Sequence, residues 1–169
     1  MSRKSRGKTT VEFSVPEHLS IIGWREWLTL PELGITRIKA KIDTGARSSA
    51  LHAFDVETFE RQGKMMVRFK VHPYQRDAQR AMTAEAELIE RRHIRSSSGH
   101  LQLRPVIKTT VALGSKQWSI ELTLTNRDVM GFRMLLGRQA VRQHFLVAPG
   151  RSFIYSSTKS CKIRNKLRK

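Results

Sequence analysis

The chain has 169 residues, and its 32 lysines and arginines against 14 acidic residues give it a formal net charge of +18 at pH 7. This length favours one domain, and the single cysteine, Cys161, excludes an intramolecular disulfide framework and a cysteine-based zinc ribbon. Because no apolar stretch is long enough for a membrane span and no secretory signal is evident, we expect no membrane association and a cytoplasmic location.

The two ends of the chain carry much of the charge. Residues 1–8 and 158–169 hold ten basic residues and no acidic one, which predicts disordered basic tails at 1–14 and 158–169 around one domain at 15–157. Without those ten, 22 basic residues against 14 acidic ones remain, so the domain itself is basic. A positive field favours an acidic partner or substrate, although RNA would be attracted by the same charge.

Alternating apolar and polar residues predict strands through most of the domain. In chain order the expected strands cover residues 22–30, 35–42, 50–60, 64–72, 107–113 and 117–124. Gln62-Gly63 and Gly114-Ser115 each separate two of these strands, and such pairs are typical of tight turns. The sequence therefore predicts two β-hairpins.

Three segments depart from this pattern. Residues 73–100 are polar and predict a mobile excursion with a short strand near 86–94. The one good helix signal covers residues 137–144, and Pro149-Gly150 predicts a turn after it. Together the elements predict a mainly β fold, closed like a barrel, with a single short helix.

The most informative segment is Lys41-Ile-Asp-Thr-Gly-Ala-Arg-Ser-Ser49, at the end of a predicted strand. Asp43 is followed at once by the hydroxyl of Thr44 and by Gly45, where the backbone can turn sharply and another chain can approach closely. Such a loop holds a carboxylate rigidly at its tip, as a general acid or base requires. An Asx-type turn that only ends a strand has the same pattern.

A second element, Met134-Leu-Leu-Gly-Arg-Gln-Ala-Val141, is an apolar strand that ends in glycine and runs into a short helix. Taken with the Asp-Thr-Gly-Ala segment, it resembles one lobe of a retropepsin-type aspartic protease. The match looks closer still to the bacterial retropepsin-like proteins often labelled "ATP-dependent zinc protease", the RimB type. The segments that carry this closer resemblance are 41–52, 95–100, 104–107 and 122–128, within a similar region of roughly residues 20–157.

The resemblance implies a single retropepsin lobe with Asp43 as its catalytic residue. The residues implied to support the active-site loop are Thr44, Gly45, Ala46, Leu135, Leu136 and Gly137. Aspartic proteolysis needs two carboxylates, and this chain has one Asp-Thr-Gly segment. We therefore expect a two-fold symmetric homodimer in which each chain contributes one Asp43, with the two carboxylates sharing a proton and a water.

The family resemblance also suggests a link to enzymes that ligate glutamates onto a ribosomal protein or onto peptides. The net charge agrees, because a basic dimer would attract a glutamate-rich chain. We therefore expect an aspartic endopeptidase that acts on acidic or glutamate-extended protein tails, with an association with the ribosome. The expected substrate contacts are Arg47, Ser48 and Arg95, with Arg91, Arg92 and Arg104 as further basic candidates.

No metal ion and no nucleotide cofactor is expected, despite the label carried by the similar proteins. The six histidines show no short ligand spacing, and there is no His-Glu-x-x-His segment. The sequence also lacks the Gly-x-x-x-x-Gly-Lys pattern that cradles ATP phosphates. Cys161 lies in the basic tail, where no rigid partner histidine is expected.

Two other interpretations stay open at this point. The chain can be read as a non-catalytic basic β-barrel module that binds ribosomal RNA or an acidic protein, with exposed aromatics as stacking faces. The aromatic candidates for that role are Phe54, Phe59, Phe69 and Tyr74. The other interpretation is a protease fold retained as an inactive adaptor. An intact motif shows that the chain has the residues for catalysis, but it does not show that catalysis takes place.

Overall fold

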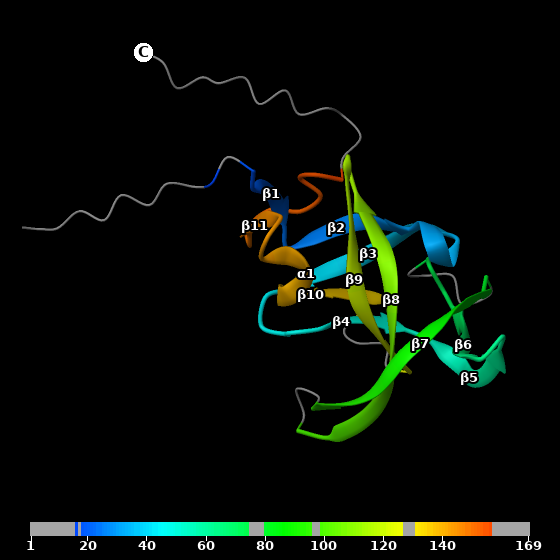
Figure 1. The fold of residues 1–169 in the computed structure, drawn as a ribbon. Helices are drawn as coiled ribbons and strands as arrows, with labels where there is room; N and C mark the ends of the chain where they lie inside the picture. Colours follow the sequence, from blue (N-terminus) through cyan, green and yellow to red (C-terminus); the bar gives the residue numbers. More distant parts are fainter. Residues whose placement is uncertain (1–15, 17, 75–79, 96–98, 127–130, 157–169) are drawn as a thin grey trace, which may run out of the picture.

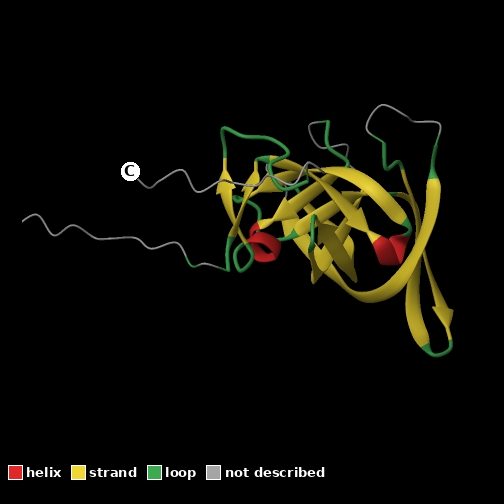
Figure 2. Ribbon diagram, turned by 90° about the horizontal axis from the view of Figure 1, so that it is seen from above, coloured by secondary structure: helices red, strands yellow, loops and turns green. Residues whose placement is uncertain are grey.

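A computed structural model describes residues 16, 18–74, 80–95, 99–126 and 131–156 of the protein (Figure 1). Strands account for most of these residues, and Figure 2 shows in red the two helical parts, one α-helix and one 3₁₀ turn. The predicted mainly β class with one short helix is therefore confirmed. The proposed tails at 1–14 and 158–169, with Cys161, lie outside the described residues.

The elements follow in the order β1 (Ser20–Gly23), β2 (Arg25–Leu30), η1 (Pro31–Leu33), β3 (Ile35–Asp43), β4 (Ser49–His52), β5 (Phe54–Arg61), β6 (Lys64–Val71), β7 (Met82–Arg95), β8 (Leu101–Leu113), β9 (Lys116–Thr125), β10 (Met134–Gly137), α1 (Arg138–Val141) and β11 (Phe145–Ala148). Nine strands form one sheet in the order β2-β3-β10-β4-β9-β8-β7-β6-β5. The other two, β1 and β11, pair with each other in parallel beside α1 (Figure 1).

One face of each central strand packs into a single hydrophobic core. On β3, Ile38 and Ala40 are fully buried while Arg37 is exposed, as the alternation of the sequence predicts. Each large aliphatic side chain in the core contributes roughly 1.5–3 kcal/mol by leaving water, so this face fixes the register of the strands. The largest fully buried side chains are Ile22, Leu28, Leu30, Ile35, Ile38, Leu51, Phe69, Ile107, Leu113, Leu122, Leu124 and Met134.

The sheet does not close into a true barrel, which corrects the closed arrangement expected from the sequence. Its first strand, β2, returns to β8 through a single register pair, Thr29 with Ala112. Residues 101–107 of β8 pair with β7, and residues 106–113 pair with β9 on the opposite edge. Among the described residues, β7 pairs with β8 only as far as Ile107. On that edge of β8, β2 can therefore pair only with the short stretch after Ile107.

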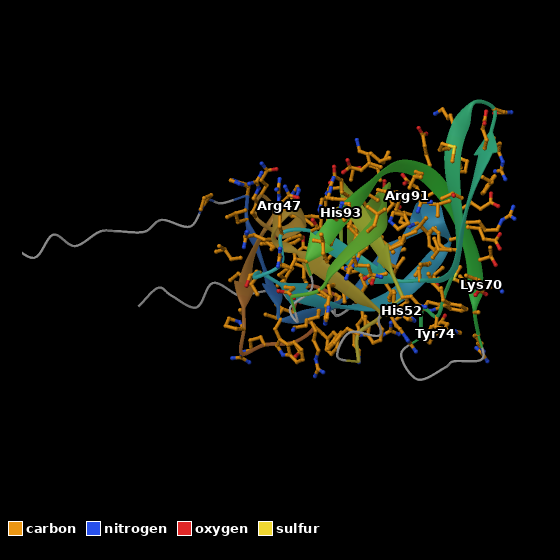
Figure 3. The ribbon with its side chains drawn as sticks, turned by 90° about the horizontal axis from the view of Figure 1, so that it is seen from below. Arg47, His52, Lys70, Tyr74, Arg91 and His93 are labelled. Carbon is orange, nitrogen blue, oxygen red and sulfur yellow. The ribbon has the colours of Figure 1, made fainter. Side chains whose placement is uncertain are left out.

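Both predicted hairpins are present. Gln62 and Gly63 turn with φ angles of 53° and 74°, and the β5–β6 hairpin that they close projects from the rest of the strands in Figures 2 and 3. Positive φ angles at both central residues give the twist that two-residue hairpins favour. Gly114, at φ 58°, supplies the same freedom between β8 and β9.

Two predicted strands are each divided in the structure. The expected strand at 22–30 breaks at Trp24, whose N–H donates to the carbonyl of Arg151 at 2.8 Å. The expected strand at 50–60 breaks at Ala53, whose N–H donates to the carbonyl of Thr125 at 3.0 Å. Both breaks are caused by contacts with segments about 70 to 130 residues away along the chain, which local alternation does not reveal.

The expected excursion at 73–100 is largely regular strand. Residues 82–95 form the 14-residue strand β7, longer than the short strand predicted near 86–94. At its far end Ile89, Arg91 and His93 are exposed, and none of the side chains after Ala84 is buried. The alternation of buried and exposed residues that marks a strand is therefore weak there. Residues 75–79 and 96–98, with most of the predicted tip at 96–99, lie outside the described residues.

Residues 151–156 run along β2 and bond to Trp24, to β2 and to the buried carboxylate of Glu26, whose exposed fraction is 0%. Its Oε1 accepts the N–H groups of Gly23 at 2.7 Å and Ile154 at 2.8 Å, with a longer bond of 3.3 Å from Tyr155. Its Oε2 accepts the N–H of Ser156 at 3.0 Å and the hydroxyl of the same serine at 2.5 Å. A buried carboxylate is tolerated when it is supplied with donors in this way.

Candidate active site

The loop after β3 holds the Asp43 carboxylate by its own backbone. Asp43 is the last residue of β3 and is partly exposed. Its Oδ1 accepts the N–H groups of Gly45 and Ala46, both at 3.1 Å, which is the geometry of an Asx turn. Among the described residues no donor reaches Oδ2, so one carboxylate oxygen is fixed while the other remains available.

Strand β10 lies directly beside β3 and runs parallel to it. The register pairs Leu135 with Lys41, Leu136 with Ile42, and Gly137 with Asp43. On its other edge β10 pairs with β4, so the strand that ends at Gly137 lies between the two strands that flank the Asp43 loop. This arrangement is central in the sheet, where both edges of β10 are satisfied.

Backbone hydrogen bonds tie the start of α1 to the loop. The N–H of Arg138 donates to the carbonyl of Ala46 at 2.8 Å, and the N–H of Gln139 donates to that of Arg47 at 3.1 Å. The guanidinium of Arg138 also donates to the carbonyl of Thr44 at 3.0 Å. The first turn of α1 therefore uses its free N–H groups to fix the loop's carbonyls.

Gly137 allows this close approach because it has no side chain. A Cβ at this position would lie 2.5 Å from the backbone carbon and oxygen of Ser48. The N–H of Gly137 donates to the hydroxyl of Ser49 at 3.1 Å, and the carbonyl of Ser49 accepts a bond from Thr123 at 3.0 Å. The glycine at the end of the apolar strand is thus a packing requirement of the loop.

The structure brings together most of the site residues expected from the sequence. Asp43 to Ser48 form one loop against Leu135, Leu136 and Gly137, with Thr44, Gly45 and Arg47 exposed at its surface. Arg95 comes from a different element, the end of β7, where it pairs with Leu101 of β8. Figure 3 labels Arg47 on the loop and Arg91 and His93 on β7.

The further basic candidates on the β7–β8 hairpin differ in their environments. Arg92 forms ion pairs with Glu90 and with Glu121, and these carboxylates raise the pKa of its guanidinium. Arg104 is buried and its Nε donates to the side chain of Gln102 at 3.1 Å. Arg91 is exposed. Of these three side chains, it is the one placed to meet a ligand from solvent.

Lysines that the sequence reasoning did not select share a face with Asp43. In a strand, residues two apart point to the same side, so Lys41 and Lys39 lie on the face of β3 that carries Asp43. Both are partly exposed. The signal was present in the alternation of β3, where the residues between the buried ones are basic.

The described residues contain no cluster of three or more His, Cys, Asp or Glu side chains with the geometry of a metal site. The aromatic candidates for nucleic-acid stacking also do not form one platform. Phe69 is fully buried, Phe54 stacks on His72 with ring centroids 4.7 Å apart, and the guanidinium groups of Arg61 and Arg68 each lie 5.0 Å from the ring centroid of Phe59. Within the described part of the chain, no helix has the length and apolar character needed to cross a membrane.

Comparison with solved structures finds the same fold. A crystal structure of a protein of unknown function from Legionella pneumophila superposes with a TM-score of 0.69 at 31% sequence identity, covering 80% of this chain and 98% of the other. The resemblance therefore extends over nearly the whole of a separately determined protein.

Two similar curated proteins are both named probable alpha-L-glutamate ligase. The protein from Shewanella halifaxensis is 47% identical over 133 residues, which are 79% of this chain and 29% of the relative. The protein from Desulfotalea psychrophila is 47% identical over 129 residues, or 76% of this chain and 28% of the relative. The chain thus spans less than a third of the length of these relatives.

A family model described as the retropepsin-like aspartic endopeptidase RimB matches residues 21–158. The matched region contains both the Asp43 loop and the β10–α1 segment that packs behind it. The chain therefore belongs to the RimB-like family of retropepsin-like proteins.

Proposed function

We propose that the protein is an aspartic endopeptidase that acts as a homodimer, with Asp43 from each chain at the two-fold axis. The observation that carries the proposal is the geometry of the Asp43 loop. Oδ1 is held by two backbone N–H groups, Oδ2 is available, and the loop is braced by β10 and α1. A carboxylate preorganised in this way is suited to acid–base chemistry.

The exposed tip of the loop supports the two-chain arrangement. Thr44 and Gly45 are exposed although they follow directly on a central strand of the sheet. Since no element among the described residues covers these two positions, a second copy of the chain can approach the loop there. An isologous dimer would bring the same loop from both chains to one axis, and that would supply the second carboxylate.

In the proposed reaction the two Asp43 side chains share one proton. The ionised Asp43 removes a proton from water as the water oxygen attacks the carbonyl carbon of the scissile amide. The protonated Asp43 donates its proton to the carbonyl oxygen, which gives a tetrahedral gem-diol. The Asp43 that took the proton from water then gives it to the amide nitrogen, the C–N bond breaks, and the other Asp43 takes a hydroxyl proton from the gem-diol. This releases a carboxylic acid and an amine and leaves one proton shared by the two carboxylates.

We propose acidic or glutamate-extended chains as the substrate class. The domain has an excess of basic residues, and those on β3 share the face of Asp43. The similar curated proteins are named as glutamate ligases, and the chain matches less than a third of their length. A peptidase region joined to a ligase region would place formation and cleavage of glutamate chains in one protein. A ribosomal protein with such a tail, in the cytoplasm, is a suitable macromolecular substrate to test.

The test compares the wild type with Asp43→Asn on a peptide that ends in several glutamates and on a neutral peptide of equal length. We expect cleavage of the acidic peptide by the wild type, and loss of that cleavage in Asp43→Asn with an unchanged circular dichroism spectrum. Asp55→Asn is the matched control, because Asp55 is an exposed aspartate on β5 that pairs with Lys70. Equal activity of wild type and Asp43→Asn would refute the catalytic role.

The oligomeric state is measured separately by light scattering with and without the acidic peptide. When wild-type and Asp43→Asn proteins are mixed and exchange subunits, the heterodimers carry one Asp43 carboxylate and should lack activity. At an equal mixture of subunits, about one quarter of the dimers would then retain both carboxylates. Activity that instead falls in proportion to the wild-type fraction would show that a single chain is sufficient.

A further inference from the structure

A row of basic side chains leads away from Asp43 along the same face of β3. Residues 37, 39, 41 and 43 alternate with buried residues, so Arg37, Lys39, Lys41 and Asp43 lie on one side of the strand. The register of β2 places Arg25 beside Lys41 and Trp27 beside Lys39. We call the five residues Arg25, Trp27, Arg37, Lys39 and Lys41 the β2–β3 strip.

Aromatic rings fix the arginines of this strip in place. The guanidinium of Arg37 lies 4.0 Å from the ring centroid of Trp27. The guanidinium of Arg25 lies 4.6 Å from that of Trp24 and 5.1 Å from that of Phe153. Trp27 and Phe153 are themselves stacked, with centroids 5.7 Å apart and planes inclined by 16°. A ring attracts and orients a cation but does not neutralise its charge.

Cations in the other half of the sheet have a different environment. On β5, β6 and β7 several exposed basic side chains are paired with carboxylates, as in Arg61 with Glu85, Lys64 with Glu87, and Lys70 with Asp55. Arg91 on β7 instead donates to the hydroxyl of Thr58 at 3.2 Å. Within the described residues, no carboxylate forms an ion pair with Arg25, Arg37 or Lys41. At Arg25, Arg37 and Lys41 the strip therefore presents positive charge that no described carboxylate pairs with, which is what an anionic ligand requires.

The spacing of the strip matches one class of anionic polymer. Side chains on one face of a strand repeat every two residues, which is about 6.6 Å. An extended polypeptide has the same repeat, so every second carboxylate of an extended glutamate chain can face successive cations of β3. The six residue-to-residue steps from Arg37 to Asp43 span about 20 Å, which is also the length of about six extended residues of a bound chain.

We propose that the β2–β3 strip is an anchoring site for an acidic polypeptide, in particular for an extended run of glutamates on one side of the bond to be cleaved. This inference rests on the proposed function, and it adds a substrate-length requirement and a set of specificity-determining residues outside the Asp43 loop. Arg37, at the far end, and Arg25, which contacts the rings of Trp24 and Phe153, are the residues assigned to recognition.

The experiment measures binding, so that its outcome does not depend on turnover. Fluorescein-labelled glutamate peptides of two, four, six and eight residues are titrated with the full-length protein at low ionic strength, and anisotropy is recorded. We expect the dissociation constant to fall with each added pair of glutamates up to about six residues and then to level off. Higher salt should weaken binding, because exposed charges are screened.

Single and double substitutions then locate the site. Arg25→Gln and Arg37→Gln should each weaken binding of the six-residue peptide roughly three- to five-fold, and the double variant about tenfold or more. Arg61→Gln is the control of equal charge, since Arg61 is exposed on β5 and pairs with Glu85. Its affinity should be that of the wild type. Thermal midpoints and circular dichroism confirm that each variant is folded before it is titrated.

Three results would overturn the inference. Equal weakening in Arg61→Gln and Arg37→Gln would show that net charge, and not this strip, determines affinity. Affinity independent of peptide length would remove the spacing argument. Tighter binding of a single-stranded RNA oligomer, lost in Arg37→Gln, would assign the strip to nucleic acid. By contrast, length-dependent binding without any cleavage would refute the proposed peptidase and leave the strip in place.

Discussion

Replacement of Glu26 by alanine should destabilise the protein strongly, because this one carboxylate accepts five hydrogen bonds. Four come from backbone N–H groups and one from the hydroxyl of Ser156. A typical hydrogen bond is worth about 1 kcal/mol net, and leaving a buried donor unsatisfied costs about 1–3 kcal/mol. Since water can replace part of the loss at the partly buried donors, we expect a total loss of about 3–5 kcal/mol.

Urea denaturation and thermal melting, both followed by circular dichroism at pH 7, measure this loss. A change of 1 kcal/mol moves the thermal midpoint of a chain of this size by about 2–4 °C, so Glu26→Ala should lower it by about 10 °C. Glu87→Ala is the control, because Glu87 forms an exposed pair with Lys64 and its removal should leave the midpoint nearly unchanged. A loss below about 1 kcal/mol for Glu26→Ala would refute the role given to the buried carboxylate.

Two further predictions concern the loop support and the pH dependence. Gly137→Ala places a Cβ 2.5 Å from the backbone of Ser48, so it should cost about 1–3 kcal/mol and lower peptidase activity, whereas Gly150→Ala, with open space around it, should do neither. Burial, with smaller contributions from Lys116 and His18, lowers the pKa of His144 below its ordinary value of 6.5. The unfolded chain therefore binds a proton at this histidine first, and stability should fall as the pH drops through 6.5. His144→Gln should reduce this slope in urea midpoints measured between pH 7.5 and 5.5, and an unchanged slope would contradict the assignment.

The sequence was sufficient where local patterns decide the structure. The alternation from Ile35 to Ile42 predicts β3 and its buried face, and the paired turn residues at 62–63 and 114–115 predict both hairpins. The Asp43 loop and the glycine-terminated strand could be related because Asp-Thr-Gly and Leu-Leu-Gly-Arg together resemble a known family, to which the chain belongs. The catalytic and substrate-binding roles assigned to Asp43, Arg47, Ser48 and Arg95 stay predictions.

Long-range contacts determine what the sequence did not predict. Trp24 and Ala53 end strands because their N–H groups bond to Arg151 and Thr125, and neither partner is visible in a local window. Glu26 occupies an inward-facing position of β2, where a charged residue would ordinarily argue for solvent. Its burial becomes understandable once residues 154–156 supply donors from the other end of the domain.

Phe153 connects this buried carboxylate to the proposed anchoring strip. Its backbone has a φ angle of 54°, which costs a non-glycine residue about 1–3 kcal/mol, and the hydrogen bonds of Glu26 to the next three residues hold it there. In that position its ring contacts both Trp27 and Arg25.

Phe153→Ala and Phe153→Gly both remove the ring without changing any charge, so both should weaken binding of the six-glutamate peptide. Glycine also relieves the backbone strain, so Phe153→Gly should be the more stable of the two by about 1 kcal/mol. Affinity equal to that of the wild type in both variants would show that the charge of Arg25 is sufficient and that its placement by the ring is not needed.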